Sequence, residues 1–162
     1  MVFSQNHFLF PILMLGAFAA GLRASLASSN SSPGELLYQW KDSNPKYLIA
    51  SSSLVSVALK MLELAGIRPE DAAKIIIVFD DGVSTEQLPT LPFIPYEGIV
   101  DQGRLKEEEK FPGSQANETV LLCYSSGTSG LPKGVEVCIV QSFIGSQANI
   151  VRVRLPTELL SQ

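Results

Sequence analysis

Short apolar runs alternate with amphipathic segments through the first half of the chain, and this alternation limits the folds open to it. Residues 24–28, 47–50 and 75–79 read as strands, and the last of them, IIIVF, is apolar throughout. The segments that begin at Pro33 and Leu54 carry the apolar spacing of a helix. Continuous apolar strands separated by helices indicate a parallel sheet. The sequence therefore predicts an α/β fold, a parallel sheet with helices on both faces.

Local signals place the ends of these elements. Ser32 and Glu35 have the spacing of a capping box at the start of a helix, and Asn44-Pro45 should end that helix. The serines at 51–53 are predicted N-caps of the next helix, and Gly66 is its predicted end. Residues 83–118 contain Pro89, Pro92 and Pro95 and a charged stretch at 104–110, which predicts surface loops with one short helix.

Residues 8–22 form an uncharged run, FLFPILMLGAFAAGL, which admits two interpretations. The run has the length of a signal-peptide core, and Ser25-Leu26-Ala27 resembles a cleavage site, although residues 1–7 contain no Lys or Arg. Alternatively, it is a helix buried on all sides, with Gly21 just beyond its end. It is shorter than the roughly 20 residues of a membrane-spanning helix, so a membrane partner is not expected.

Composition excludes several function classes. At 162 residues the chain fits one domain, and its net charge of -4 offers no basic surplus for nucleic acid. Two cysteines and one histidine cannot make a disulfide framework or a four-ligand zinc site by themselves, and a Ser-His-Asp triad would depend on His7 alone.

A loop rich in glycine and hydroxyl groups, SSGTSGLPKG at 125–134, lies between predicted strands at 119–124 and 134–137. Glycines let backbone N–H groups approach a phosphate, hydroxyls add donors, and Lys133 adds a positive charge. The spacing differs from both the Walker A loop and the Rossmann loop. Taken alone, the pattern fits either a phosphate-holding loop or an ordinary Gly-Pro hairpin loop.

The longer string YSSGTSGLPKGVE resembles the signature of the adenylate-forming acyl-activating enzymes, the AMP-dependent synthetases and ligases. The upstream segments GAFAAG and SPGELLYQWKDS resemble the 4-coumarate–CoA ligase branch, so the resemblance covers residues 3–136. This resemblance favours the buried helix for residues 8–22 and a cytoplasmic location. A secreted or membrane-associated protein remains the alternative.

The resemblance implies a partial N-terminal domain of an acyl-adenylate synthetase, with a β-hairpin that carries the phosphate loop. Such enzymes activate a carboxylic acid with ATP and Mg²⁺ and then transfer the acyl group to coenzyme A. It implies no catalytic residue and no metal ligand within this chain. The residues that it assigns to ATP are Ser125, Ser126, Gly127, Thr128, Ser129, Gly130, Pro132, Lys133 and Gly134.

The chain also departs from the family pattern. Family members are several times longer, and the small C-terminal domain with its catalytic lysine has no counterpart here. Residues 1–136 are therefore predicted to be a partial AMP-binding domain, and 137–162 an atypical tail of the kind that a truncated gene model or retained intron produces. We expect this chain alone to lack ligase activity. The alternatives are a small nucleotide-binding or regulatory protein, or a secreted protein with a cleaved leader.

Overall fold

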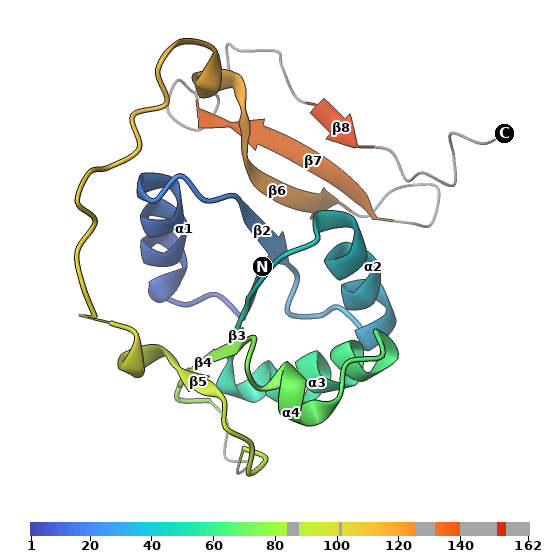
Figure 1. The fold of residues 1–162 in the computed structure, drawn as a ribbon. Helices are drawn as coiled ribbons and strands as arrows, with labels where there is room; N and C mark the ends of the chain where they lie inside the picture. The colour runs from blue at the N-terminus through green and yellow to red at the C-terminus, as the bar shows by residue number, and fades with distance from the viewer. Residues whose placement is uncertain (84–87, 101, 126–131, 140–151, 155–162) are drawn as a thin grey trace, which may run out of the picture. The chain divides into compact units, whose positions relative to one another are not determined.

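The structure is a computed structural model that describes residues 1–83, 88–100, 102–125, 132–139 and 152–154. It divides into two compact units, which are described separately. The first unit consists of Met1–Phe8 and Ala27–Arg104, and the second consists of Leu9–Leu26 and Leu105–Gln162. Figure 1 shows the elements of both units.

The first unit contains a parallel sheet in the order β5-β4-β3-β1. Its strands are β1 (Val2–Phe3), β3 (Leu48–Ser51), β4 (Ile76–Phe79) and β5 (Ile94–Pro95). In the register of the two central strands, Leu48 pairs with Ile76 and Ser51 pairs with Phe79. The predicted α/β fold with a parallel sheet is thus confirmed.

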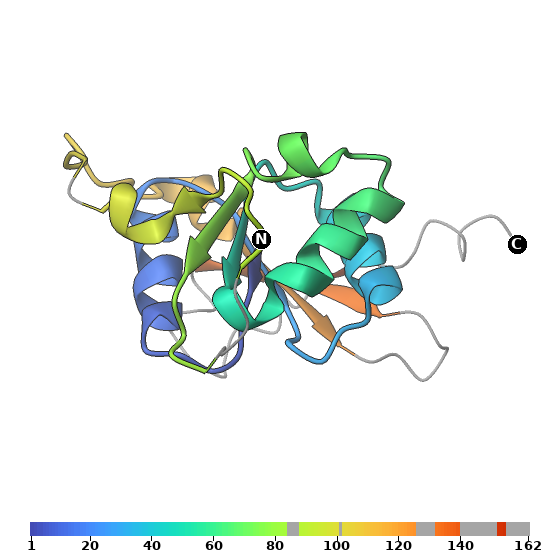
Figure 2. The same ribbon diagram turned by 90° about the horizontal axis from the view of Figure 1, so that it is seen from below.

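Three helices of the first unit pack on one side of this sheet, as Figure 2 shows. They are α2 (Pro33–Ser43), α3 (Val55–Leu64) and α4 (Pro69–Ala72). Leu36 of α2 and Met61 and Leu62 of α3 are fully buried in one cluster with Leu48 and Ile76 of the strands. On the other face of β4, the Phe79 ring lies 5.1 Å from the His7 ring and 6.5 Å from the Tyr96 ring, between centroids.

The predicted ends of two helices are confirmed. The Ser32 N–H donates to Glu35 Oε2 at 2.8 Å, and the Glu35 N–H donates to Ser32 Oγ at 3.3 Å, which completes the capping box of α2. At the end of α3, Gly66 has a φ of +79°. Its N–H donates to the Glu63 carbonyl, and the next N–H donates to the Leu62 carbonyl, which is the Schellman arrangement.

The prediction that the serines at 51–53 cap the next helix is wrong. Neither the 3-10 turn Ser52–Leu54 nor α3 has a side-chain cap hydrogen bond at its start. Instead, Ser52 Oγ donates to Asp81 Oδ1 at 2.9 Å, and Ser53 Oγ donates to Asp81 Oδ2. The hydroxyls bind Asp81 because a hydrogen bond from a hydroxyl to a charged carboxylate is strong. The alternative, a hydrogen bond that the hydroxyl accepts from a neutral backbone N–H in a helix cap, is weaker. The hydroxyls tie the end of β3 to the turn after β4.

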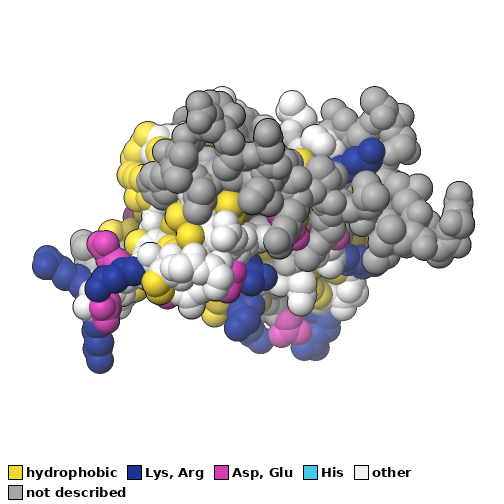
Figure 3. Space-filling view, turned by 90° about the horizontal axis from the view of Figure 1, so that it is seen from above, with side chains coloured by type: hydrophobic (Ala, Val, Ile, Leu, Met, Phe, Trp, Pro, Cys, Tyr) yellow, Lys and Arg dark blue, Asp and Glu magenta, His cyan; other side chains and the backbone are white. Residues whose placement is uncertain are grey.

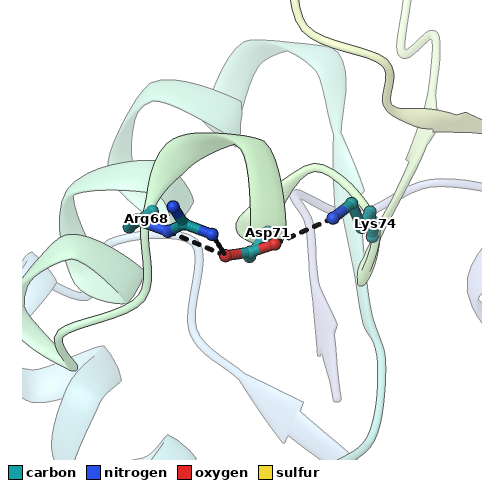
Figure 4. A network of polar contacts seen from close by, with 3 residues as sticks. All are labelled: Arg68, Asp71 and Lys74. Carbon is teal, nitrogen blue, oxygen red and sulfur yellow. Dashed lines mark hydrogen bonds and ion pairs between the residues drawn. The ribbon is translucent and has the colours of Figure 1, made fainter.

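A small network of charges surrounds α4 (Figure 4). Asp71 Oδ2 accepts from Arg68 Nη2 at 2.7 Å, and Asp71 Oδ1 accepts from Lys74 Nζ at 2.8 Å. Hydrogen bonds from Lys74 and Arg68 lower the pKa of Asp71. All three side chains are substantially exposed, so the network orients the short helix but contributes little to stability.

The second unit contains a mixed sheet in the order β2-β6-β7-β8. Its strands are β2 (Ala24–Ala27, of which Ala27 belongs to the first unit), β6 (Thr119–Ser125), β7 (Lys133–Cys138) and β8 (Arg152–Arg154). β2 runs parallel to β6, while β6 with β7 and β7 with β8 are antiparallel. The predicted β-hairpin is therefore present as β6 and β7.

The apolar run at 8–22 folds as helix α1 (Leu9–Ala19) in the second unit. Gly21, with a φ of +66°, follows it as predicted. Met14, Ala17 and Phe18 pack with Ala24 and Leu121, but only Phe18 is fully buried within α1. The expectation of a helix buried on all sides is therefore wrong, because α1 contacts the sheet along one face only.

Exposed apolar side chains lie along and next to α1, and hydrophobic side chains reach the surface in Figure 3. They are Phe8, Ile12, Leu15 and Leu22, each more than half exposed. In the part of the chain that the structure describes, we find no helix long and apolar enough to cross a membrane.

The segment predicted as loops contains three short elements. β5 extends the parallel sheet, and 3-10 turns follow at Tyr96–Gly98 and Gly113–Asn117. Near its end, the Glu109 N–H donates to the Ala19 carbonyl at 2.8 Å. The described charged residues at 104 and 106–110 are exposed, as expected of a solvated face.

Candidate functional site

The candidate site is the hairpin of β6 and β7 and the connection between them. The last residue of β6, Ser125, is paired in register with the first residue of β7, Lys133. The next pair is Tyr124 with Gly134. Seven residues, 126–132, connect the two strands. Most hairpin connections have 2–5 residues, and longer ones are commonly functional.

The register assigns the paired residues to faces of the hairpin. Side chains alternate along a strand, so Ser125 shares a face with Cys123 and Leu121 on β6. On β7, Lys133 shares that face with Val135 and Val137, the partners of Cys123 and Leu121. This is the face that packs on α1. The apolar core thus fixes the strand ends from which the loop departs.

The structure describes four of the nine residues predicted to bind ATP. Ser125 is exposed at the end of β6, Pro132 and Lys133 are half-buried, and Gly134 is buried within β7. The predicted residues Ser126, Gly127, Thr128, Ser129 and Gly130 lie outside the described residues. Hence the assignment of all nine to ATP stays a prediction.

One contact at the base of the hairpin was missed by sequence reasoning. Thr119 Oγ1 donates to Glu136 Oε2 at 2.9 Å and joins the start of β6 to β7. Thr119 is paired with Cys138, and a bulge follows before Leu121 pairs with Val137. No sequence pattern marks this contact, because it depends on the bulge.

The described residues of the site offer neither an activated thiol nor a group of metal-binding side chains. Burial raises the pKa of the Cys123 thiol, so the thiol is neutral at pH 7 and is a poor nucleophile. Among the described residues, no three His, Cys, Asp or Glu side chains are grouped so as to hold a metal ion. The described part of the site is suited to binding through hydroxyl, N–H and ammonium groups.

The described residues define an α/β fold with a hydroxyl- and glycine-rich connection between two antiparallel strands. The profile of the AMP-binding enzyme family matches residues 1–154. The chain therefore belongs to the AMP-binding enzyme family.

Two individual relatives agree with this family assignment. Acyl-CoA synthetase 7 of Caenorhabditis elegans is 31% identical over 124 residues, which are 76% of this chain and 21% of that protein. The 4-coumarate–CoA ligase-like 3 of Arabidopsis thaliana is 25% identical over 138 residues, which are 83% of this chain and 23% of that protein. The chain thus spans less than a quarter of the length of these two relatives.

A solved structure shows the same fold. The benzoate CoA ligase from Burkholderia xenovorans LB400 superimposes with a TM-score of 0.64 at 22% identity. The match covers 88% of this chain and 24% of that one. The fold of this chain is therefore that of a part of an acyl-CoA ligase. The division at residue 136 into a domain and an atypical tail stays a prediction.

Proposed function

We propose that this chain supplies the ATP-phosphate loop of an enzyme that activates a carboxylic acid as an acyl-adenylate and transfers the acyl group to coenzyme A. The observation that carries the proposal is the pairing of Ser125 with Lys133 at the ends of β6 and β7. It brings both ends of the hydroxyl- and glycine-rich segment to one end of a core-supported hairpin. Membership of the AMP-binding enzyme family supports the nucleotide as ligand.

In this proposal the residues act by binding and orienting the phosphates. Ser125, Thr128 and Ser129 offer hydroxyl donors, and the glycines let backbone N–H groups approach the phosphate oxygens. Lys133 contributes a positive charge near the pyrophosphate that leaves. Donors held in position before reaction stabilise negative charge that grows in the transition state.

The proposal includes Mg²⁺ and coenzyme A because the chain belongs to the AMP-binding enzyme family. When bound with ATP, Mg²⁺ neutralises charge on phosphate oxygens. No described residue is assigned as its ligand, because the described acidic, His and Cys side chains form no suitable group. The proposal places the protein in the cytoplasm with ATP and a carboxylic acid as its partners, and the net charge of -4 supports no nucleic-acid partner.

Titration of the purified 162-residue chain with ATP and with pyrophosphate tests the proposal. Amide resonances of Ser125, Lys133 and Gly134 should shift in two-dimensional NMR, with a smaller effect from adenosine. Thr128→Ala combined with Ser129→Ala should abolish these shifts, because it removes two hydroxyl donors.

The matched control for this titration is Ser56→Ala, which removes an exposed hydroxyl from α3. It should leave the shifts unchanged. Absence of any shift at the strand ends with saturating ATP, in a folded chain, would remove the loop from nucleotide binding.

A further inference from the structure

A cavity of about 510 Å³, open to solvent, lies in the first unit. It lies beside residues that directly follow two parallel strands: Ser52 comes after β3, and Asp80 comes after β4. The cavity volume lies within the range of small-molecule sites.

The lining combines two carboxylates with a mostly apolar wall. The carboxylates belong to Asp80 and Glu97, and Ser52 adds a hydroxyl. The apolar lining residues are Val78, Leu88, Pro89, Leu91, Phe93 and Pro95.

The charge of this lining is uncompensated within the described part of the chain. The ion pairs found among the described residues involve neither Asp80 nor Glu97. Asp80 Oδ1 accepts from the Gly82 N–H at 2.9 Å, so a neutral donor orients this carboxylate, and Ser52 Oγ lies 3.4 Å from the same oxygen. Ser52 Oγ donates to Asp81 Oδ1 at 2.9 Å, so Asp81 adds a third negative charge nearby.

The two carboxylates and the apolar wall together determine which class of ligand the cavity can bind. A hydrated metal ion would gain nothing from six apolar side chains, and a carboxylic acid would be repelled by the two carboxylates. An organic ammonium ion satisfies both parts of the lining, because its charged head pairs with carboxylates while its body covers apolar surface. A phenyl or short alkyl body fits the cavity volume.

We propose that this cavity binds a small organic ammonium ion, with the ammonium group between Asp80 and Glu97 and the apolar body against the wall that includes Leu91 and Phe93. Asp80 is the stronger anchor, because its carboxylate is already oriented by the Gly82 N–H. This proposal does not depend on the proposed function.

Calorimetric titration of the purified 162-residue chain with phenethylammonium at pH 7 tests the proposal. Two probes separate the contributions: 2-phenylethanol has the same body without the charge, and methylammonium has the charge without the body. We expect each to bind at least about tenfold more weakly than phenethylammonium, since one charge-assisted contact or a buried ring is worth a factor of this order.

Two substitutions locate the site. Asp80→Asn and Glu97→Gln should each weaken phenethylammonium binding about tenfold, and Asn at position 80 retains an oxygen for the Gly82 N–H. Glu63→Gln, which removes an exposed carboxylate from α3 outside the cavity lining, is the control and should have no effect. Circular dichroism of each variant checks that it is folded.

Several outcomes would overturn the proposal. If 2-phenylethanol bound as tightly as phenethylammonium, the carboxylates would not contribute to binding. If methylammonium bound as tightly as phenethylammonium, the apolar wall would not contribute. Unchanged affinity in both folded variants would place the amine elsewhere. Absence of phenethylammonium binding to the folded parent chain would also exclude the site.

Discussion

Ser53 Oγ donates a hydrogen bond to Oδ2 of Asp81 and so connects the residues after β3 with the turn after β4. Burial raises the pKa of Asp81, but hydrogen bonds from Ser53, Ser52, the Val83 N–H and Ser51 outweigh it and lower the pKa to about 2. The ordinary value is 3.8. Folding therefore favours the charged form of Asp81.

This depressed pKa predicts acid sensitivity. The contribution of Asp81 to stability should be complete above about pH 4 and should be lost as the pH falls through about 2. Because the carboxylate is partly exposed, we expect about 1 kcal/mol. In Asp81→Asn, urea unfolding should show this smaller stability already at pH 7 and a flatter dependence between pH 4 and pH 2. Parallel curves for parent and variant in that interval would assign the effect to another carboxylate.

The capping box of α2 gives a second prediction. Ser32→Ala removes the acceptor of the Glu35 N–H and should lower the free energy of unfolding by about 1 kcal/mol. Thermal and urea unfolding measure the loss. Ser31→Ala changes the neighbouring serine, which has no role in the box, and should be neutral. Equal effects of the two substitutions would contradict the importance of the cap.

The end of α3 gives a third prediction. Gly66 has a φ of +79°, so Gly66→Ala places a Cβ in a backbone conformation that costs about 1–2 kcal/mol. Nothing crowds the position within 4 Å, so the loss is one of backbone strain. Gly34→Ala is the matched control, because Gly34 is equally uncrowded and its φ is not positive. Similar unfolding midpoints for both variants would argue against strain at position 66.

A fourth prediction concerns the loop in a complete enzyme. In a chimera that joins residues 1–136 to the remainder of a full-length 4-coumarate–CoA ligase, Thr128→Ala with Ser129→Ala should slow ATP–pyrophosphate exchange. A loss of about 10²–10³ is expected, the order found when one transition-state donor is removed. Lys133→Ala should cost less, since water replaces a flexible ammonium more readily.

The controls for the chimera are the unmodified chimera and Ser56→Ala, which should be equally active. The 162-residue chain alone should show no exchange. If the double variant of an active chimera exchanged at the unmodified rate, the loop would have no part in adenylation.

Sequence reasoning succeeded where the deciding contact is local. The capping box at Ser32 and the glycine at 66 depend on residues at most five positions apart, and both are as predicted. The hairpin was also predicted, because a strand precedes and follows the glycine-rich segment. The ATP assignment rests on the family resemblance more than on composition or spacing, and it stays a prediction.

Sequence reasoning failed where the partner is distant or the element is very short. The partner of Ser53 is 28 positions away, so a local cap was the wrong choice. β1 and β5 have two residues each, too few for a periodic pattern. The burial of α1 was overestimated because hydrophobicity shows that a helix can be buried and does not show which neighbours cover it.

The pairing of Ser125 with Lys133 has a consequence for insertions and deletions in this family. A residue gained or lost between Lys133 and Val137 would shift the pairing by one and turn Lys133 to the opposite face of the hairpin. A residue gained within 126–132 would change the length of the connection, but each side chain of the two strands would stay on its own face of the hairpin. Length variation among active relatives should therefore be rare in the strand that follows the connection.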